Sequence, residues 1–285
     1  MVRISDVWEQ TTDVLVGRGR LLGRIAVLAF FLPFAVQGAV KAYGGASPGA
    51  AALGALVALV AAVTTVWGLL AIIAMASDPA VTRADAGALA RRRLPAALLV
   101  ALIAGAAALL ATVPIFAALA VGGYDFQAAA GQAGSATAPT LAPGSALFVS
   151  LYGLLLFGVA LWLGARLFLL NPVVALERRG IGAFGRSFRL TRGLAWRLIG
   201  VNLLFTLVWG VVAFAARAIV FIAFRLLLGS ANIATAVWLA SLADAAVTSA
   251  LVVVVGVFAA RLYVAVTARE PRPAADPAHA PGPWG

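Results

Sequence analysis

Residues 145–176 read SALFVSLYGLLLFGVALWLGARLFLLNPVVAL, a run in which Arg166 is the first and Glu177, just beyond it, the next charged side chain. A helix needs about 20 mostly apolar residues to cross the hydrocarbon core of a bilayer. An open sheet cannot satisfy its backbone groups in lipid, so the run has to be helical there. This stretch therefore predicts a transmembrane helix and sets the fold class.

Five further apolar runs lie on either side of this one. The chain of 285 residues is 64% hydrophobic and 11% charged, whereas soluble domains are about 25% charged. We therefore predict an all-α integral membrane protein, a six-helix bundle formed by a single domain over residues 1–270, followed by a disordered cytoplasmic tail at 271–285. The other expected spans are 25–43, 50–76, 94–121, 198–228 and 235–266.

The basic residues are distributed very unevenly between the connections. Sixteen arginines lie in the N-terminal segment, the tail, and the connections after the second and fourth spans, whereas the remaining connections hold only Lys41. Cytoplasmic loops of membrane proteins are enriched in Lys and Arg. Both termini are therefore expected in the cytoplasm, and the formal net charge of +11 is explained without a nucleic-acid partner.

Three basic segments precede alternate spans and have the pattern of amphipathic helices at a membrane surface. The first is expected over about 4–22, the second starts at a Thr82–Asp85 capping box, and the third covers about 181–193. Two interpretations stay open. The chain either contains three copies of a basic helix followed by a hairpin, or any array of hairpins has to begin each unit with a basic stretch.

Charged side chains inside the spans are costly and usually face a partner or water. Arg217 and Arg225 in the fifth span, and Asp244 in the sixth, are expected in the outer half of the bundle. We expect Asp244 to form an interhelical ion pair with Arg217 or Arg225. The alternative is that these groups belong to a path for a substrate or for protons.

Arg166 and Arg261 are expected near the inner ends of their spans. Pro172 bends the chain after Arg166, so Glu177 is expected to turn back and pair with these arginines. The alternative is a basic pocket for an anionic lipid headgroup. The candidate headgroup residues are Arg166, Arg186, Ser187, Arg189, Thr191, Arg192 and Arg261.

Residue usage argues against most catalytic sites. The chain has no cysteine, and its one histidine, His279, lies in the tail. Cysteine nucleophiles, serine–histidine dyads and histidine-ligated metals are therefore absent from the spans. The single lysine, Lys41, follows Val40 and so cannot belong to a P-loop. We expect no catalytic residue, no metal and no cofactor.

Two parts of the sequence resemble a known family: the segment from 166 to 197 and a short stretch near the end of the last span. The text from Arg166 through Asn171-Pro172 and RSFRLTRG at 186–193 to Trp196-Arg197, with Arg261-Leu262-Tyr263 near the end, resembles the membrane domain of glycerophosphoryl diester phosphodiesterases. The resemblance covers roughly residues 1–270. It implies a multi-pass protein of the bacterial inner membrane, and it does not imply the phosphodiesterase activity, which in that family belongs to a separate soluble barrel.

Two functions follow as hypotheses. The first is a non-enzymatic membrane module that engages anionic phospholipid, or a protein partner, through an arginine-rich cytoplasmic face. The second is a small-solute transporter or exporter subunit. A cavity reaching Asp244 would favour transport, and a closed apolar core with a basic rim would favour the lipid module. The sequence points to no particular protein partner or oligomeric state.

Overall fold

The computed structural model describes residues 3–45, 47–126, 142–177 and 179–269. Within these ranges the secondary structure is entirely helical. Six helical runs are long and apolar enough to cross a membrane, so the predicted all-α membrane protein is confirmed. The predicted tail at 271–285 lies outside the described residues.

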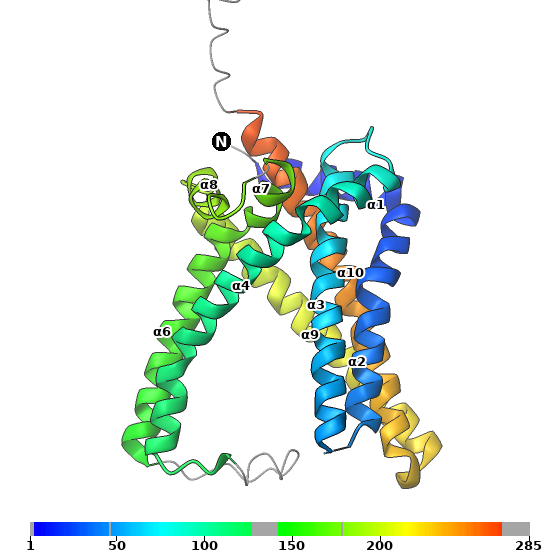
Figure 1. Ribbon diagram of the computed structural model, residues 1–285, viewed down its shortest axis with the longest axis vertical. Helices are drawn as coiled ribbons and strands as arrows, with labels where there is room; N and C mark the ends of the chain where they lie inside the picture. Colours follow the sequence, from blue (N-terminus) through cyan, green and yellow to red (C-terminus); the bar gives the residue numbers. More distant parts are fainter. Residues whose placement is uncertain (1–2, 46, 127–141, 178, 270–285) are drawn as a thin grey trace, which may run out of the picture.

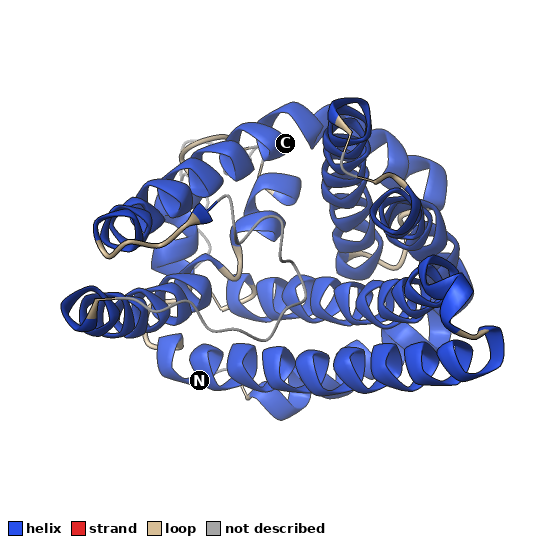
Figure 2. Cartoon of the chain, turned by 90° about the horizontal axis from the view of Figure 1, so that it is seen from below, coloured by secondary structure: helices blue, strands red, loops and turns tan. Residues whose placement is uncertain are grey.

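The first run is one uninterrupted helical path of three elements. Helix α1 (Ile4–Ala26) continues through the π-helix η1 (Val27–Phe31) into α2 (Leu32–Tyr43). A proline has no N–H to donate to the carbonyl four residues earlier, and Pro33 thus leaves Ala29, inside η1, without its usual helical donor. The helix expected over about 4–22 and the span expected from 25 follow one another without a loop, and α1 runs across the direction of α2 (Figures 1 and 2).

Helices α3 (Pro48–Ser77) and α4 (Arg83–Val121) both begin at side-chain caps. Ser47 Oγ accepts a hydrogen bond of 3.2 Å from the backbone N–H of Ala50. Thr82 and Asp85 form the predicted capping box, in which the Asp85 N–H donates to Thr82 Oγ1 over 3.3 Å. Such caps satisfy backbone donors that the first turn leaves free.

The run that sets the fold class forms one candidate span over Pro143–Leu176, in agreement with the span expected over 145–176, but its helix is interrupted near the end. Helix α6 (Pro143–Leu167) stops, and the short α7 (Leu170–Leu176) starts after a turn at Phe168 and Leu169. The reason is again a proline, since Pro172 cannot donate to the carbonyl of Phe168. Helix α7 is consequently free to pack into the core, with Val173, Val174 and Ala175 buried.

The C-terminal part consists of one short helix and two long ones. These are α8 (Ala183–Leu190), α9 (Ala195–Leu228) and α10 (Ile233–Thr267), with the 3-10 turn η2 (Ser230–Asn232) before α10. Gly193 and Gly229 adopt φ values of 82° and 71° in the connections on either side of α9. Glycine enters this left-handed region without a Cβ penalty, and both reversals of the chain depend on it.

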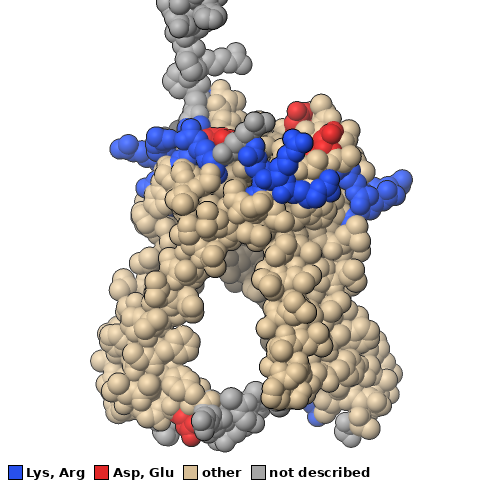
Figure 3. All heavy atoms as spheres, viewed as in Figure 1, with Lys and Arg blue, Asp and Glu red and all other residues tan. Residues whose placement is uncertain are grey.

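The long helices form two limbs that meet at one end (Figures 1 and 2). One limb consists of α2, α3 and α10, and the other of α4 and α6, while α9 packs on both α6 and α10. Lys and Arg gather at the end where the limbs meet, and an opening separates the limbs beyond it (Figure 3). We call the end where the limbs meet the basic end, and the opposite end, where the opening separates the limbs, the far end.

The core lies toward the basic end. Its buried side chains include residues 70–76 of α3, Val173 and Val174 of α7, and Phe258 of α10. Burial is very different between the limbs: 39% of the most apolar stretch of α10 is buried, against 0% in the run that contains α6. The α4–α6 limb therefore contributes most of its surface to the surroundings rather than to a protein core.

Glycines allow close helix contacts within the α2–α3–α10 limb. A Cβ at Gly68 would collide with the Ala29 side chain, and one at Gly256 would lie 2.9 Å from Leu69 Cδ1. Gly38 faces Ser241 just as closely, which brings α2 against α10. Small residues of this kind are typical of helix interfaces in membranes, where close backbone approach gives packing energy.

Candidate functional site

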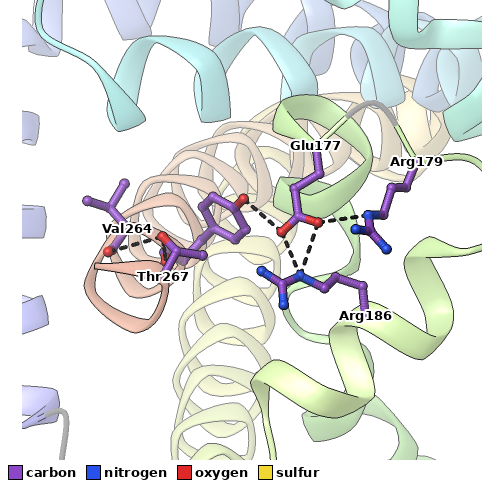
Figure 4. Close-up of polar contacts among 6 residues, drawn as sticks. Glu177, Arg179, Arg186, Val264 and Thr267 are labelled. Atoms are coloured by element: carbon purple, nitrogen blue, oxygen red, sulfur yellow. Dashed lines mark hydrogen bonds and ion pairs between the residues drawn. The ribbon is translucent and has the colours of Figure 1, made fainter. Parts of the chain in front are cut away.

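A polar cluster around Glu177 ties the basic end together (Figure 4). Arg186 Nε donates to both Glu177 carboxylate oxygens, over 2.8 and 3.0 Å, and Arg179 Nε lies 3.0 Å from Oε2. Tyr263 Oη donates to Oε1 over 3.0 Å. Since Glu177 follows α7, Arg186 belongs to α8 and Tyr263 to α10, one carboxylate joins three helices.

The partners of Glu177 correct the sequence-based expectation. It pairs with Arg179 and Arg186, and not with Arg166 or Arg261, which form no ion pair within 4.0 Å among the described residues. The bend before Pro172 does turn the chain back, but it directs Glu177 toward α8 and α10. Both groups of the Glu177–Arg186 pair are largely buried, with 15% and 17% of their side-chain surfaces exposed.

Arg166 holds α8 in place through its contacts and is not a cation that is available to a ligand. Its guanidinium lies over the rings of Trp162 and Phe188, 5.5 and 5.9 Å from their centroids, and Nη1 donates to the Phe188 carbonyl over 3.3 Å. Ser187 Oγ donates to the Arg166 carbonyl over 2.7 Å. The carbonyl is available because the helix stops just after it.

Ser187 and Thr191 face inward, which changes their expected role. Both side chains are fully buried, and Thr191 Oγ1 donates to the carbonyls of Ser187 and Arg166, over 2.8 and 3.3 Å. Their hydroxyl groups hold the turn that follows α8 and cannot reach a headgroup. Of the predicted patch, only Arg189 and Arg192 are exposed, so the structure divides it into an inner and an outer set.

Arg261 lies inside the basic end, apart from the exposed arginines. It is half-buried on α10, its Nε atom is buried without a hydrogen-bond acceptor among the described residues, and its charged neighbours are Arg18 and Asp13 of α1. Arg18 itself is engaged elsewhere, since its Nη1 donates to the Met75 carbonyl over 2.8 Å and its Nη2 bonds Pro79. A cation at these carbonyls complements the dipole of α3.

A hollow of about 510 Å³ lies between α4 and α7 at the basic end. Arg92 and Arg93 line it together with Asp85 and the apolar Ala175 and Leu176. The Asp85 carboxylate is held by the cap, where it accepts from Thr82 Oγ1 over 2.6 Å. Neither arginine has an acidic partner within 4.0 Å in the described part of the chain. Sequence reasoning assigned these arginines only to topology.

Asp244 and Arg217 lie on one cavity in the half of the bundle near the far end. This cavity, of about 260 Å³, lies between α2, α9 and α10 and is also lined by Lys41 and Gln37. The expected ion pair is not formed: within the described residues, no Lys or Arg nitrogen lies within 4.0 Å of the Asp244 carboxylate. Arg225 instead lies over the Phe221 ring, 5.9 Å from its centroid.

Another hollow lies next to the charged cavity, toward the basic end, along α9 and α10. It measures about 410 Å³, and Thr65, Asn202 and Thr206 are among its lining residues. Trp209 and Thr248 line both this hollow and the charged cavity, and their side chains are joined by a 3.0 Å hydrogen bond from Trp209 Nε1 to Thr248 Oγ1. Polar groups therefore follow α9 and α10 through much of their length.

No cluster of three or more His, Cys, Asp or Glu side chains suited to a metal ion occurs among the described residues. The arrangement offers cations for anionic groups at the basic end, and both signs of charge in the cavity near the far end. No protein-family model, curated protein or solved structure matches the chain.

Proposed function

We propose that this protein is a non-enzymatic module of a bacterial inner membrane that binds anionic phospholipid headgroups at its basic end. The observation that carries the proposal is the hollow between α4 and α7, where Arg92 and Arg93 face a space of about 510 Å³ with no acidic partner within 4.0 Å in the described part of the chain. The family resemblance of the 166–197 segment supports the bacterial inner membrane as its location.

The chemistry of the hollow suits a phosphate group. Arginine holds phosphate through two parallel N–H donors, which lysine cannot do. Basic side chains next to an anionic leaflet gain about 1 kcal/mol each. Ala175 and Leu176 on the opposite wall provide an apolar surface for the glycerol and the first part of the acyl chains, so the hollow matches an amphipathic ligand.

The direct test replaces the two arginines of the hollow by lysine, which keeps the charge. We expect the double variant Arg92→Lys, Arg93→Lys to retain about tenfold less cardiolipin or phosphatidylglycerol in native mass spectrometry of the purified protein. The matched control is Arg189→Lys, Arg192→Lys, which alters two exposed arginines of the same end. Equal retention by wild type and the hollow variant would contradict the proposal.

We also propose that the basic end and both termini face the cytoplasm, as the arginine distribution predicts. Cysteines at exposed positions separate the two faces: Ser5→Cys and Ala80→Cys for the basic end, and Ser47→Cys and Asn232→Cys for the far end. Only the second pair should react with an impermeant thiol reagent added to intact cells. Ser187 is unsuitable as a reporter because it is buried.

We further propose that three similar units, each a basic amphipathic helix at the membrane surface followed by a hairpin, make up the chain. The units would cover about 4–77, 83–176 and 183–267. If they are structural repeats, a chain divided in the connections at Ala80 and at Gly180 should reassemble when the three pieces are expressed together. Failure of any piece to insert with its hairpin would favour the simpler array of hairpins.

Transport of a small solute remains a second candidate, because the cavity of about 260 Å³ reaches Asp244. Transport requires that a site open to each side of the membrane in turn. A cysteine at Ser241, which lines this cavity, should then react with thiol reagents from either side. Reaction from the far side alone would argue for a one-sided binding site and against transport.

A further inference from the structure

The cavity between α2, α9 and α10 brings together two cations and one acid that come from three helices. Lys41 is contributed by α2, Arg217 by α9 and Asp244 by α10. We infer that this cavity binds the zwitterionic headgroup of a phospholipid, with the phosphate on Lys41 and Arg217 and a primary ammonium group on Asp244. This site is separate from the hollow between α4 and α7 and does not depend on it.

The separation of the charges is the first argument. Opposite charges in a bundle surrounded by hydrocarbon attract strongly, yet no cationic nitrogen of the described residues lies within 4.0 Å of Asp244. The space they share measures about 260 Å³. A ligand that carries both signs of charge satisfies the acid and the cations at once.

The second argument is an apolar hollow next to the charged cavity. It measures about 400 Å³ and is lined mainly by Phe214, Ala218 and Phe221 of α9, with Val237 and Ala240 of α10. Arg217 and Val237 line both spaces, so the charged group and the apolar wall adjoin. A headgroup beside a place for hydrocarbon is the chemistry of a lipid rather than of a free polar solute.

The acid selects between phospholipids. A primary ammonium presents three N–H donors to the carboxylate, and charge-assisted hydrogen bonds of this kind are about twice as strong as neutral ones. A trimethylated ammonium has no N–H donor, and a glycerol headgroup has no positive charge to compensate Asp244. An ethanolamine headgroup therefore fits better than choline or glycerol.

The first experiment uses the unaltered protein and a series of lipids. Trp209, which lines the cavity, and Trp238 nearby on α10 provide intrinsic fluorescence for titrations with phospholipids that carry zero, one, two or three N-methyl groups. We expect the affinity to fall stepwise, by about tenfold or more over the series. Equal affinity for all four lipids would overturn the inference, and no variant has to fold for that result.

The second experiment assigns the two halves of the headgroup. Asp244→Asn should abolish the difference between the ethanolamine and choline lipids, whereas Arg217→Gln should weaken both by a similar factor. The control is the double variant Arg92→Lys, Arg93→Lys, which should leave the series unchanged even if it loses anionic lipid at the basic end. Retention of the ethanolamine preference by Asp244→Asn would also overturn the inference.

A third measurement separates a lipid from a soluble source of the same group. Glycerophosphoethanolamine carries the phosphate and the ammonium without acyl chains. If the apolar hollow takes a chain, this compound should compete at least about a hundredfold more weakly than the lipid, because each buried CH₂ contributes about 0.8 kcal/mol. Competition as strong as that of the lipid would contradict a lipid ligand and indicate a soluble zwitterion.

Discussion

The two limbs of the molecule are built from similarly apolar helices but are held in different ways. In the α2–α3–α10 limb, Gly38, Gly68 and Gly256 bring helix backbones into close contact. In the α4–α6 limb, Gly105, Gly153 and Gly158 have no neighbouring atom within 4 Å of the position of a Cβ. Apolarity alone therefore brings a helix into the membrane, and it is the placement of small residues that decides which helices pack tightly there.

The limbs meet at the basic end in the apolar core, and polar contacts there tie the short helices to the long ones. Glu177 connects α7, α8 and α10 through Arg186 and Tyr263, and Arg166 holds α8 from the end of α6. We therefore expect disturbance of a glycine contact to reduce the free energy of unfolding most in the α2–α3–α10 limb. Disturbance of the Glu177 cluster should loosen the α4–α6 limb.

The largest effect is expected from Gly68→Leu. A Cβ at this position collides with Ala29, and further atoms would meet the Phe30 ring, so α3 has to move away from η1. Overpacking of this kind costs about 1–3 kcal/mol, and we expect the upper part of that range in a steric trap or thermal unfolding measurement in detergent. Gly158→Leu is the matched control and should cause no loss of stability, because a side chain at Gly158 meets no neighbour.

Glu177→Gln should have the next largest effect, about 2 kcal/mol. The substitution keeps the shape but removes the negative charge that the largely buried Arg186 contacts, and thermal unfolding of the purified protein measures the loss. Arg179→Gln removes the partner whose side chain is 49% exposed, and should cost less than 1 kcal/mol. Equal losses for both variants would mean that burial does not set the strength of the cluster.

A small gain is expected from Gly158→Ala in the α4–α6 limb. The added methyl group meets no neighbour, and alanine is favoured over glycine in a helix by about 0.5–1 kcal/mol. Unfolding at equal detergent concentration should show this gain, whereas Gly256→Ala, whose methyl would lie 2.9 Å from Leu69 Cδ1, should lose stability. A loss at Gly158 would contradict the open surroundings that the structure gives this position.

The smallest effect is expected for the coupling between Asp244 and Arg217. Because they form no ion pair within 4.0 Å, a double-mutant cycle with Asp244→Asn and Arg217→Gln should give less than about 0.5 kcal/mol in lipid-free detergent. Addition of an ethanolamine phospholipid should raise the coupling, since one ligand then contacts both side chains. A coupling above about 1 kcal/mol without lipid would restore the direct salt bridge.

Much of the fold could be predicted because lipid allows few backbone solutions. Hydropathy gave six spans, and the Thr82–Asp85 spacing gave the start of α4. A helix ahead of the first span and a bend near Pro172 were expected, but the π-helix that joins α1 to α2 and the two-residue turn after Leu167 were not. Both depend on which carbonyl a proline leaves free and on how the neighbouring helices then hold the chain, and that second condition is a matter of tertiary packing.

Less of the candidate sites could be predicted. Arg186, Ser187, Arg189 and Thr191 follow one another closely in the sequence, yet Ser187 and Thr191 are buried while Arg189 is exposed. The amphipathic pattern of this segment separates an apolar from a basic face, but it does not show that the hydroxyl groups of Ser187 and Thr191 are taken up by the carbonyl of Arg166. Arg92 and Arg93 looked like topological charges, because the hollow beside them arises only when α7 returns toward α4. Lys41, Arg217 and Asp244 meet for a similar reason, at the crossing of three helices.

The opening between the limbs (Figure 3) has a mechanical consequence. A void there would forfeit the dispersion contacts of its walls, so in a bilayer we expect acyl chains to fill the opening and to press on both limbs. Thicker or more ordered bilayers would then do work on the protein as they push the two limbs apart or together. The conformation would then depend on the elastic state of the membrane, and the distance between spin labels placed at Ser47 and Ser150 would measure this dependence.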